Sequence, residues 1–264
     1  MSQTAVKEQE RDQAKILAEE LTRPKSFAPE RTSPVERVKQ LDLKYADADT
    51  EEFLRAMIQD EFAGRIALVS SFGSEAAVLL DFVSRIKRDL PVIFIDTGMH
   101  FAQTLEYREK VSELLGLKDV RSITPDPEDI ATHDPDETLW QKDTDKCCNI
   151  RKVKPLDRGL QGFDAWINGR KQIHGGERIR LPRLEASGKF IKINPLAHWT
   201  REDIDRAFER SGLPHHPMVE QGYLSIGCWP CTMPSRSGDI RSGRWKEIDK
   251  TECGIHEPLT GIGS

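Results

Sequence analysis

Five cysteines are the side chains of this sequence best suited to chemistry, and four of them form two close pairs. Cys147 and Cys148 are adjacent, whereas Cys228 and Cys231 are separated by two residues, one of which is Pro230. A Cys-x-x-Cys spacing lets two sulfur atoms turn toward one centre, and Pro230 favours a tight backbone there. Neighbouring side chains normally point apart, so two adjacent cysteines at one centre imply a strained local geometry. We expect the two pairs to share one centre.

Three kinds of centre are consistent with four sulfur atoms. Disulfide bonds are typical of secreted chains, and this sequence shows no secretory context. Four thiolates bind a structural zinc ion, and they also bind an iron–sulfur cluster. If Cys147 and Cys148 begin a helix, Arg151 and Lys152 lie one turn further on, where positive charge stabilises an anionic cluster. The spacing alone leaves zinc and iron open.

The fifth cysteine lies apart from both pairs, on a polar segment near the end of the sequence. Cys253 is followed by Gly254, and His256 is close by. A nearby imidazolium favours the thiolate, which is the nucleophilic form of cysteine. The segment therefore predicts either a nucleophile or a spectator thiol.

The scaffold that positions these residues is predicted from alternating strand and helix patterns. Short apolar runs predict strands at 65–70, 90–95, 120–123 and 163–167. Helices are expected at 33–45, at 51–62 with Thr50 as N-cap, at 76–83, at 102–115, and at 201–211 with Thr200 as N-cap. Such alternation indicates an α/β fold, with a mainly parallel sheet and helices on both faces.

Ligands of parallel sheets bind beyond the carboxyl ends of the strands. Three loops follow strands in this way, at 70–75, 96–98 and 168–170, so we expect them to converge on one site. The first loop leads from a strand into a helix, which is a phosphate-binding arrangement, although an ordinary turn has the same pattern. Cations follow the fourth strand and favour a ligand with several negative charges; they are Arg170, Lys171, Arg178, Arg180 and Arg183.

Composition limits the possible partners of the 264-residue chain. A net charge of −5 argues against bulk binding to nucleic acid. No stretch approaches 18 consecutive apolar residues, so we expect no membrane span. The first residues lack the apolar core of a signal peptide, which predicts a cytoplasmic location with reduced thiols.

The motifs together resemble those of the assimilatory adenylyl-sulfate (APS) reductases, within the phosphoadenylyl-sulfate (PAPS) reductase family. The resemblance extends from about Ser70 to His256. The segments that carry it are Ser70-Ser71-Phe72-Gly73-x-Glu75, Asp96-Thr97-Gly98, Cys147-Cys148-x-x-Arg151-Lys152, Trp166-x-x-Gly169, Gly227-Cys228-x-Pro230-Cys231, Arg241-x-x-Arg244-Trp245 and Glu252-Cys253-Gly254-Ile255-His256. Two departures are Ile255, where the family more often has Leu, and Phe72, where some members have Ser.

The resemblance implies a fold, a cofactor and a set of site residues. The fold is that of the adenine nucleotide α-hydrolases, with a nucleotide- and cluster-binding domain at 51–232 between an N-terminal arm at 1–50 and a mobile catalytic segment at 233–264. The cofactor is a [4Fe–4S] cluster bound by Cys147, Cys148, Cys228 and Cys231. The implied substrate-binding residues are Ser70, Gly73, Ile95, Asp96, Gly169, Arg178, Arg241 and Arg244, with Lys152 between the cluster and the substrate.

The implied reaction is an attack of the Cys253 thiolate on the sulfate sulfur of APS, which releases AMP and leaves an S-sulfonate. Reduced thioredoxin then releases sulfite through a mixed disulfide. The resemblance also implies a homo-oligomer, a dimer or a tetramer. PAPS as substrate, or activity on both, stays open within the family. Outside it, a zinc-bound tRNA thiolase would carry a Ser-Gly-Gly-x-Asp-Ser loop and a more basic surface. A non-catalytic cluster-binding protein would not need Cys253.

Overall fold

The structure, a computed structural model, describes residues 32–236, 239–245, 250 and 252–256. From Pro34 onward these residues belong to one compact unit. Most of the arm predicted at 1–50 lies outside the described residues, as does part of the segment predicted to be mobile at 233–264. Helix α2 packs against strand β5, and its Leu41 is completely buried, so residues 34–50 are part of the same unit.

The elements alternate along the chain as the sequence predicts. The α-helices are α2 (Pro34–Lys44), α3 (Thr50–Ala56), α4 (Ala76–Ile86), α5 (Ala102–Leu115), α6 (Pro127–His133), α7 (Leu139–Lys142), α8 (Thr144–Cys148), α9 (Lys154–Gly159) and α10 (Arg201–Ser211). The strands are β1 (Ile66–Val69), β2 (Val92–Ile95), β3 (Val120–Ile123), β4 (Ala165–Ile167), β5 (Leu184–Ser187) and β6 (Phe190–Ile193). Short helical segments of π type are η1 (Met57–Glu61) and η2 (Asn149–Val153); those of 3₁₀ type are η3 (Gln172–His174), η4 (Gly176–Arg180), η5 (Val219–Gln221), η6 (Trp229–Cys231) and η7 (Gly254–His256).

The strands form one sheet in the order β3-β2-β1-β4-β6-β5. All neighbours are parallel except β5 and β6, which form an antiparallel hairpin at one edge. The hairpin is absent from the sequence prediction. Each of its strands has four residues, and Leu184-Glu185-Ala186-Ser187 lacks the β-branched residues that mark strands.

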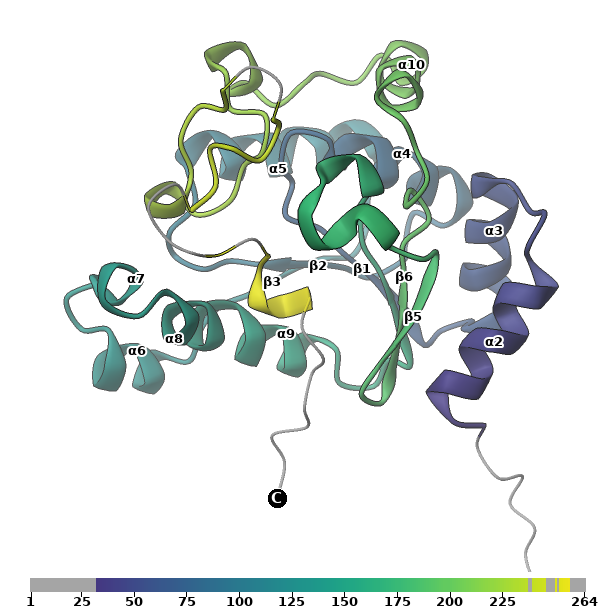
Figure 1. Cartoon of the computed structure of the whole chain (residues 1–264), viewed down its shortest axis with the longest axis horizontal. Helices are drawn as coiled ribbons and strands as arrows, with labels where there is room; N and C mark the ends of the chain where they lie inside the picture. Colours follow the sequence, from purple (N-terminus) through teal and green to yellow (C-terminus); the bar gives the residue numbers. More distant parts are fainter. Residues whose placement is uncertain (1–31, 237–238, 246–249, 251, 257–264) are drawn as a thin grey trace, which may run out of the picture. The chain divides into compact units, whose positions relative to one another are not determined.

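Two apolar layers cover the sheet, because successive residues of a strand face opposite sides. Ile66 and Leu68 of β1 face the layer formed with α3, α4, α5 and α10, whereas Ala67 and Val69 face the layer formed with α9. Figure 1 shows α4 and α5 on one side of the sheet and α8 and α9 on the other. The predicted parallel sheet with helices on both faces is therefore confirmed.

The helix predictions are correct in position, and one predicted N-cap differs. Helices α5 and α10 have the predicted bounds, and Thr200 caps α10 in a reciprocal capping box with Asp203. The N-cap of α3 is Asp49, whose side chain accepts a hydrogen bond from the Glu52 N–H at 2.8 Å, so the prediction of Thr50 is wrong. Thr50 instead accepts a hydrogen bond from the Trp199 indole at 2.9 Å, a contact between distant segments that local sequence does not show.

The adjacent cysteines end a helix rather than begin one. Helix α8 runs to Cys148, and the backbone continues into the π-helical segment η2 with Cys148 at φ −62° and ψ −37°. This is an unstrained helical conformation, so the predicted local strain is wrong. The capping aspartate Asp143, whose side chain accepts from the Lys146 N–H at 2.8 Å, sets the start of α8 before the pair.

No helix in the described part of the chain is long and apolar enough to span a membrane.

Candidate active site

A cavity of about 230 Å³ lies beyond the carboxyl ends of β1, β2 and β4. The loops that follow these strands supply Ser70, Thr97 and Asn168 to its wall. The remaining wall comes from later segments of the chain, including the loop before Cys228 and the segment around Cys253. Strand ends that are distant in sequence therefore converge as the parallel topology predicts.

Most substrate-binding residues implied by the resemblance line this cavity. They are Ser70, Gly73, Ile95, Lys152, Gly169, Arg178, Arg241 and Arg244. Asp96 is not among the lining residues, although it is next to one. Its carboxylate accepts a hydrogen bond from the Gly98 N–H at 3.1 Å, which closes the turn after β2.

Phe72 supports the loop at 70–75 from the side of the core. This residue is completely buried, stacks edge-to-face on Phe94 at 5.8 Å, and adopts a positive φ of 49°. Its N–H donates to the Ser70 hydroxyl at 3.2 Å. A non-glycine residue in this conformation is strained, and such strain is typical of functional loops. Phe72 thus shapes the loop from the core side, while Ser70 and Gly73 line the cavity.

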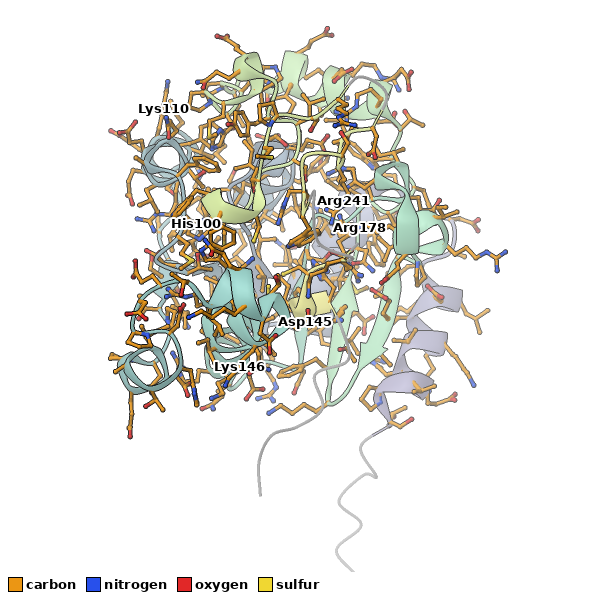
Figure 2. All side chains as sticks on the ribbon, turned by 60° about the vertical axis from the view of Figure 1, so that its left-hand side comes forward. His100, Lys110, Asp145, Lys146, Arg178 and Arg241 are labelled. Atoms are coloured by element: carbon orange, nitrogen blue, oxygen red, sulfur yellow. The ribbon has the colours of Figure 1, made fainter. Side chains whose placement is uncertain are left out.

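The cluster of cations after β4 divides between the cavity and other sites. Arg178 is buried and faces the cavity, where Figure 2 shows it next to Arg241. Arg180 is exposed and lies outside the lining residues. Arg183 donates to the carbonyl oxygens of Tyr45 and Ala48 and lies over the ring of Phe53. The expectation that this whole group binds an anion is wrong for Arg180 and Arg183.

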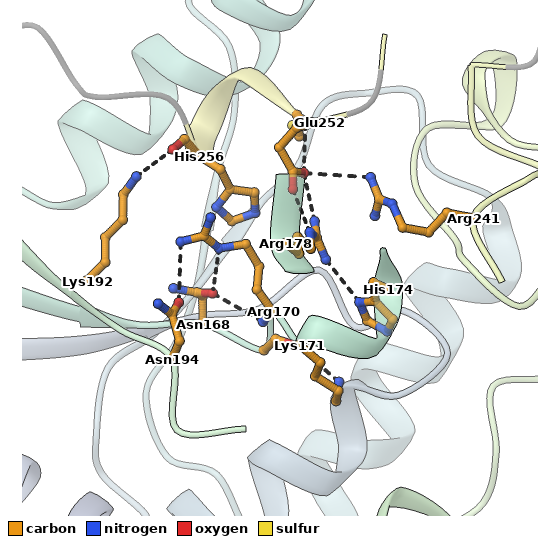
Figure 3. A network of polar contacts seen from close by, with 12 residues as sticks. Asn168, Arg170, Lys171, His174, Arg178, Lys192, Asn194, Arg241, Glu252 and His256 are labelled. Atoms are coloured by element: carbon orange, nitrogen blue, oxygen red, sulfur yellow. Dashed lines mark hydrogen bonds and ion pairs between the residues drawn. The ribbon is translucent and has the colours of Figure 1, made fainter. Parts of the chain in front are cut away.

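A buried polar network, missed by the sequence prediction, runs along one side of the cavity (Figure 3). Glu75 accepts hydrogen bonds or ion pairs from Lys171 at 2.8 Å, from His174 at 3.1 Å and from Arg201 at 2.6 Å. Burial alone would raise the pKa of Glu75, but Lys171, His174 and Arg201 hold it well below its usual value. Glu75 is therefore a fixed negative charge that orders the cations around it.

The same network continues to the segment that carries Cys253. His174 Nδ1 is 3.0 Å from Arg178 Nη1, and Arg178 forms a two-point ion pair with Glu252 at 2.5 and 2.7 Å. Burial disfavours the Glu252 carboxylate, yet Arg178 and nearby His256 keep its pKa far below the ordinary value. The sequence motifs include Glu75, Lys171, Arg178 and Glu252, but nothing in the sequence indicates that these side chains contact one another.

The segment 239–245 brings two arginines over the Cys-x-x-Cys loop. Arg244 pairs with Thr232 in a β-bridge, and its Nε donates to the Cys231 carbonyl oxygen at 3.3 Å. Arg241 and Arg244 both lie over the ring of Trp245, at 5.4 and 4.4 Å from its centroid. Backbone pairing and the buried tryptophan therefore hold both guanidinium groups at the cavity.

Segment η7, which directly follows Cys253, packs against the sheet. The Lys192 ammonium donates to the His256 carbonyl oxygen at 2.7 Å, and the His256 ring is stacked on Trp166. Ile255 packs against the apolar layer of α9. Cys253 itself is partly buried and lines the cavity.

The thiols of both cysteine pairs are buried, and Cys228 lies near both Cys147 and Cys231. All five cysteines are free thiols, so a disulfide framework is excluded in this structure. Burial and the neighbouring Cys228 raise the pKa of Cys147 to about 11. Burial and Cys228 also raise the pKa of Cys231. Cys228 also lies 3.3 Å from the Thr97 hydroxyl.

Lys152 connects the thiols to the cavity. Burial by itself would lower the pKa of Lys152, but Cys228, Cys253 and Cys148 raise it. A hydrogen bond from the Cys148 thiol lowers the pKa of Cys253, against burial, which raises it. Lys152 and Arg244 also lower it, and these two positive charges still favour a thiolate at Cys253 when Cys148 is a metal ligand rather than a protonated donor.

Arg151 has a different role from its neighbour. It is 3% exposed, forms an ion pair with Asp134 at 2.7 Å, and donates to the Thr97 carbonyl oxygen at 2.9 Å. This pairing ties η2 to the loop after β2, next to Cys147. Arg151 is therefore a buried contact between η2 and the loop after β2, and it does not lie on a solvated helix face.

The four paired cysteines supply the donor atoms that a cluster or a zinc ion requires, although their side chains are not arranged around one metal centre in this structure. They are the four buried cysteines of the chain, and the positive charge of Lys152 lies beside two of them. Within the described residues, no group of three or more histidine, cysteine, aspartate or glutamate side chains is arranged to hold a metal ion.

Comparison with known proteins decides the family. The sequence profile of the phosphoadenosine phosphosulfate reductase domain matches residues 65–234. The chain belongs to the phosphoadenosine phosphosulfate reductase family. This confirms the resemblance of the motifs. The matched region contains the four paired cysteines and ends before Cys253.

Relatives within the phosphoadenosine phosphosulfate reductase family extend over most of the chain. The adenosine 5'-phosphosulfate reductase of Mesorhizobium japonicum is 47% identical over 223 residues, which cover 84% of this chain and 87% of that protein. Adenosine 5'-phosphosulfate reductase 1 of Bacillus subtilis is 40% identical and covers 74% of this chain and 86% of its own length.

Solved structures agree with the family and the fold. The phosphoadenylyl-sulfate reductase of Candida auris, in a phosphate complex, is 28% identical with a TM-score of 0.63, covering 75% of this chain and 97% of that one. The FMN adenylyltransferase of Candida glabrata is 17% identical with a TM-score of 0.53, and the match covers 89% of this chain and 82% of that one. It shows the fold alone, and the expected adenine nucleotide α-hydrolase-like architecture is confirmed.

Proposed function

We propose that this protein is an APS reductase, which converts adenosine 5'-phosphosulfate to sulfite and AMP with electrons from thioredoxin. The single observation that carries the proposal is the position of Cys253 on the wall of a cavity that four arginines also line, namely Arg170, Arg178, Arg241 and Arg244. A soft nucleophile among fixed cations suits transfer of an anionic sulfo group. The relatives named above support APS as the substrate.

The first half-reaction forms a covalent intermediate. The Cys253 thiolate attacks the sulfate sulfur of APS and forms an S–S bond. The bond from that sulfur to the bridging oxygen breaks, and AMP leaves with the electron pair. Arg241 and Arg244 neutralise the charge that develops on the departing phosphate and on the sulfonate oxygens.

The second half-reaction returns the enzyme to its thiol form. One thiolate of reduced thioredoxin attacks Cys253 Sγ, and sulfite leaves with the S–S electron pair. The second thioredoxin thiol then resolves the mixed disulfide and restores Cys253. The two electrons that reduce the sulfo group therefore come from the thioredoxin dithiol.

Cys147, Cys148, Cys228 and Cys231 are the residues that would bind a [4Fe–4S] cluster. When bound, the cluster would supply a fixed charge next to Lys152, and it has no required role as electron carrier. Lys152 extends from η2 into the cavity wall, so it places a positive charge where the sulfate group of the substrate would bind.

The direct test is turnover by protein purified without air, with APS or PAPS at equal concentration. We expect sulfite and AMP in equal amounts from APS, and only when reduced thioredoxin is present. Faster turnover of PAPS would reassign the substrate within the family. The absence of sulfite from both substrates would contradict the reductase proposal and favour a non-catalytic cluster-binding protein.

A further inference from the structure

The glutamate directly before Cys253 has no role in the proposed reaction, yet its side chain is held at two points. Glu252 Oε2 accepts from Arg178 Nε at 2.5 Å, and Oε1 accepts from Arg178 Nη2 at 2.7 Å. Both side chains are only 9% exposed. A buried, bidentate arginine–carboxylate pair fixes orientation as well as distance.

The arginine of this pair is anchored to side chains that follow β1 and β4. Arg178 Nη1 is 3.0 Å from His174 Nδ1, and His174 Nε2 is 3.1 Å from Glu75. Glu75 in turn pairs with Lys171 at 2.8 Å. The ion pair therefore joins the segment of Cys253 to Glu75 and Lys171, in the loops after β1 and β4; Figure 3 shows its part from Glu252 through Arg178 to His174.

The carboxylate also contacts the backbone of the nucleophile itself. Glu252 Oε1 accepts a hydrogen bond from the Cys253 N–H at 2.9 Å. The Glu252 carboxylate thus binds Arg178 and also orients the peptide that carries Cys253. Arg241, at 3.6 Å, adds a second positive charge on the same carboxylate.

We infer that the Arg178–Glu252 ion pair is a latch that holds Cys253 at the cavity, and that both are positioning residues. The inference rests on the proposed function of Cys253, and it adds a positioning role to Arg178, which the resemblance assigned to substrate binding. In the substrate-free protein, two of the nitrogens of Arg178 bind the tail.

A competing explanation makes Glu252 a stand-in for the anionic substrate. In that case the Glu252 carboxylate blocks Arg178 until the nucleotide displaces it. The two explanations differ in what happens when Glu252 becomes neutral. Loss of a blocking group strengthens AMP binding, whereas loss of a latch leaves the AMP affinity unchanged and loosens the tail.

Hydrogen exchange of the backbone amides in the peptide 250–256 measures the latch without any reaction. We expect Glu252→Gln to raise exchange there about tenfold or more in cluster-loaded, substrate-free protein, since a hydrogen-bonded charge is lost. Arg178→Lys keeps the charge without the two-point geometry and should raise exchange less.

The matched control is the other ion pair between this tail and the body. Lys250 pairs with Asp145, whose side chain is 83% exposed. Lys250 is only 10% exposed, but solvent screens the charge of Asp145, so Asp145→Asn should raise exchange much less than Glu252→Gln does. Unchanged exchange in Glu252→Gln, or AMP binding that is tighter than in the wild type, overturns the latch.

A second readout links the latch to the nucleophile. In a single turnover with APS and no thioredoxin, Glu252→Gln should modify Cys253 at least tenfold more slowly, with unchanged Kd for AMP. The charge-exchanged variant Arg178→Glu/Glu252→Arg should recover part of the lost protection. If APS is not cleaved even by the wild type, the proposed function fails, while hydrogen exchange still decides the latch.

Discussion

The guanidinium of Arg244 lies against the backbone of Gly227, the residue before Cys228. A β-carbon at position 227 would come within 2.5 Å of Arg244 Nη2 and 2.6 Å of its Cζ. Glycine is therefore the residue type that lets this arginine pack over the Cys-x-x-Cys loop. The contact connects a predicted substrate-binding residue directly to the predicted cluster loop.

Gly227→Ala should displace Arg244 while leaving the fold intact, because the atoms in the way are the far end of a flexible side chain. We expect AMP binding to weaken by about 1–2 kcal/mol, measured by calorimetry. The iron content and the Tm serve as controls for damage to the neighbouring Cys228. Unaltered AMP affinity would show that Arg244 reaches the nucleotide without this contact.

Arg244→Ala should weaken binding of both APS and AMP by about 1.5–3 kcal/mol, the range for hydrogen bonds to charged groups. The matched control is Arg180→Ala, which removes an exposed arginine outside the cavity. Equilibrium binding with both variants makes the comparison. Equal losses in the two variants would point to general electrostatic attraction and remove Arg244 from the site.

His216 should make the folded state less stable as the pH falls from 6.5 toward 4. It is completely buried, and burial lowers its pKa from 6.5 to about 4. The unfolded state therefore binds the proton at a higher pH than the folded state does. Acidification from pH 7 to pH 5 should lower the free energy of unfolding by about 2 kcal/mol.

The measurement is urea unfolding of His216→Gln and wild type at pH 7 and pH 5. The loss of unfolding free energy on acidification should be about 2 kcal/mol smaller in the variant. His215→Gln changes the exposed neighbour, which is stacked on Phe208, and should keep the wild-type pH dependence. An unchanged pH slope in His216→Gln would mean that this histidine is not buried in the neutral form.

Replacing a paired cysteine should remove bound iron, whereas replacing Cys253 should not. Protein purified without air should contain about four iron and four sulfide per chain. Cys228→Ser should lose most of the iron and lower the Tm, because metal binding and folding are coupled. Cys253→Ser should retain both. A colourless wild type with one zinc ion would contradict the cluster.

Elements with strong local patterns were predictable from the sequence. Helix α10 begins at the capping box of Thr200 and Asp203, and strands β1 and β2 are uniformly buried apolar runs. Because parallel strands end at the same edge, the convergence of Ser70 and Gly169 on one cavity followed from the topology.

Contacts between distant segments were not predictable in this way. The pairs Glu75–His174 and Arg178–Glu252 join residues 99 and 74 positions apart, and no local pattern marks their partners. Asp96 follows a strand as the other site residues do, but its carboxylate closes a turn instead of lining the cavity. Which residue a charged side chain contacts depends on how the chain packs, so the sequence shows the residue type but not its partner.

The measurement that tests the account most directly is the mass of the peptide that holds Cys253 after wild-type protein meets APS without thioredoxin. Transfer of one sulfo group in the first half-reaction should add about 80 Da to that peptide, with AMP released in equal amount. Reduced thioredoxin should then remove the added mass and yield sulfite. Cys253→Ser should bind APS and show neither the adduct nor AMP release. A sulfonate on any other cysteine, or full turnover by Cys253→Ser, would contradict the account.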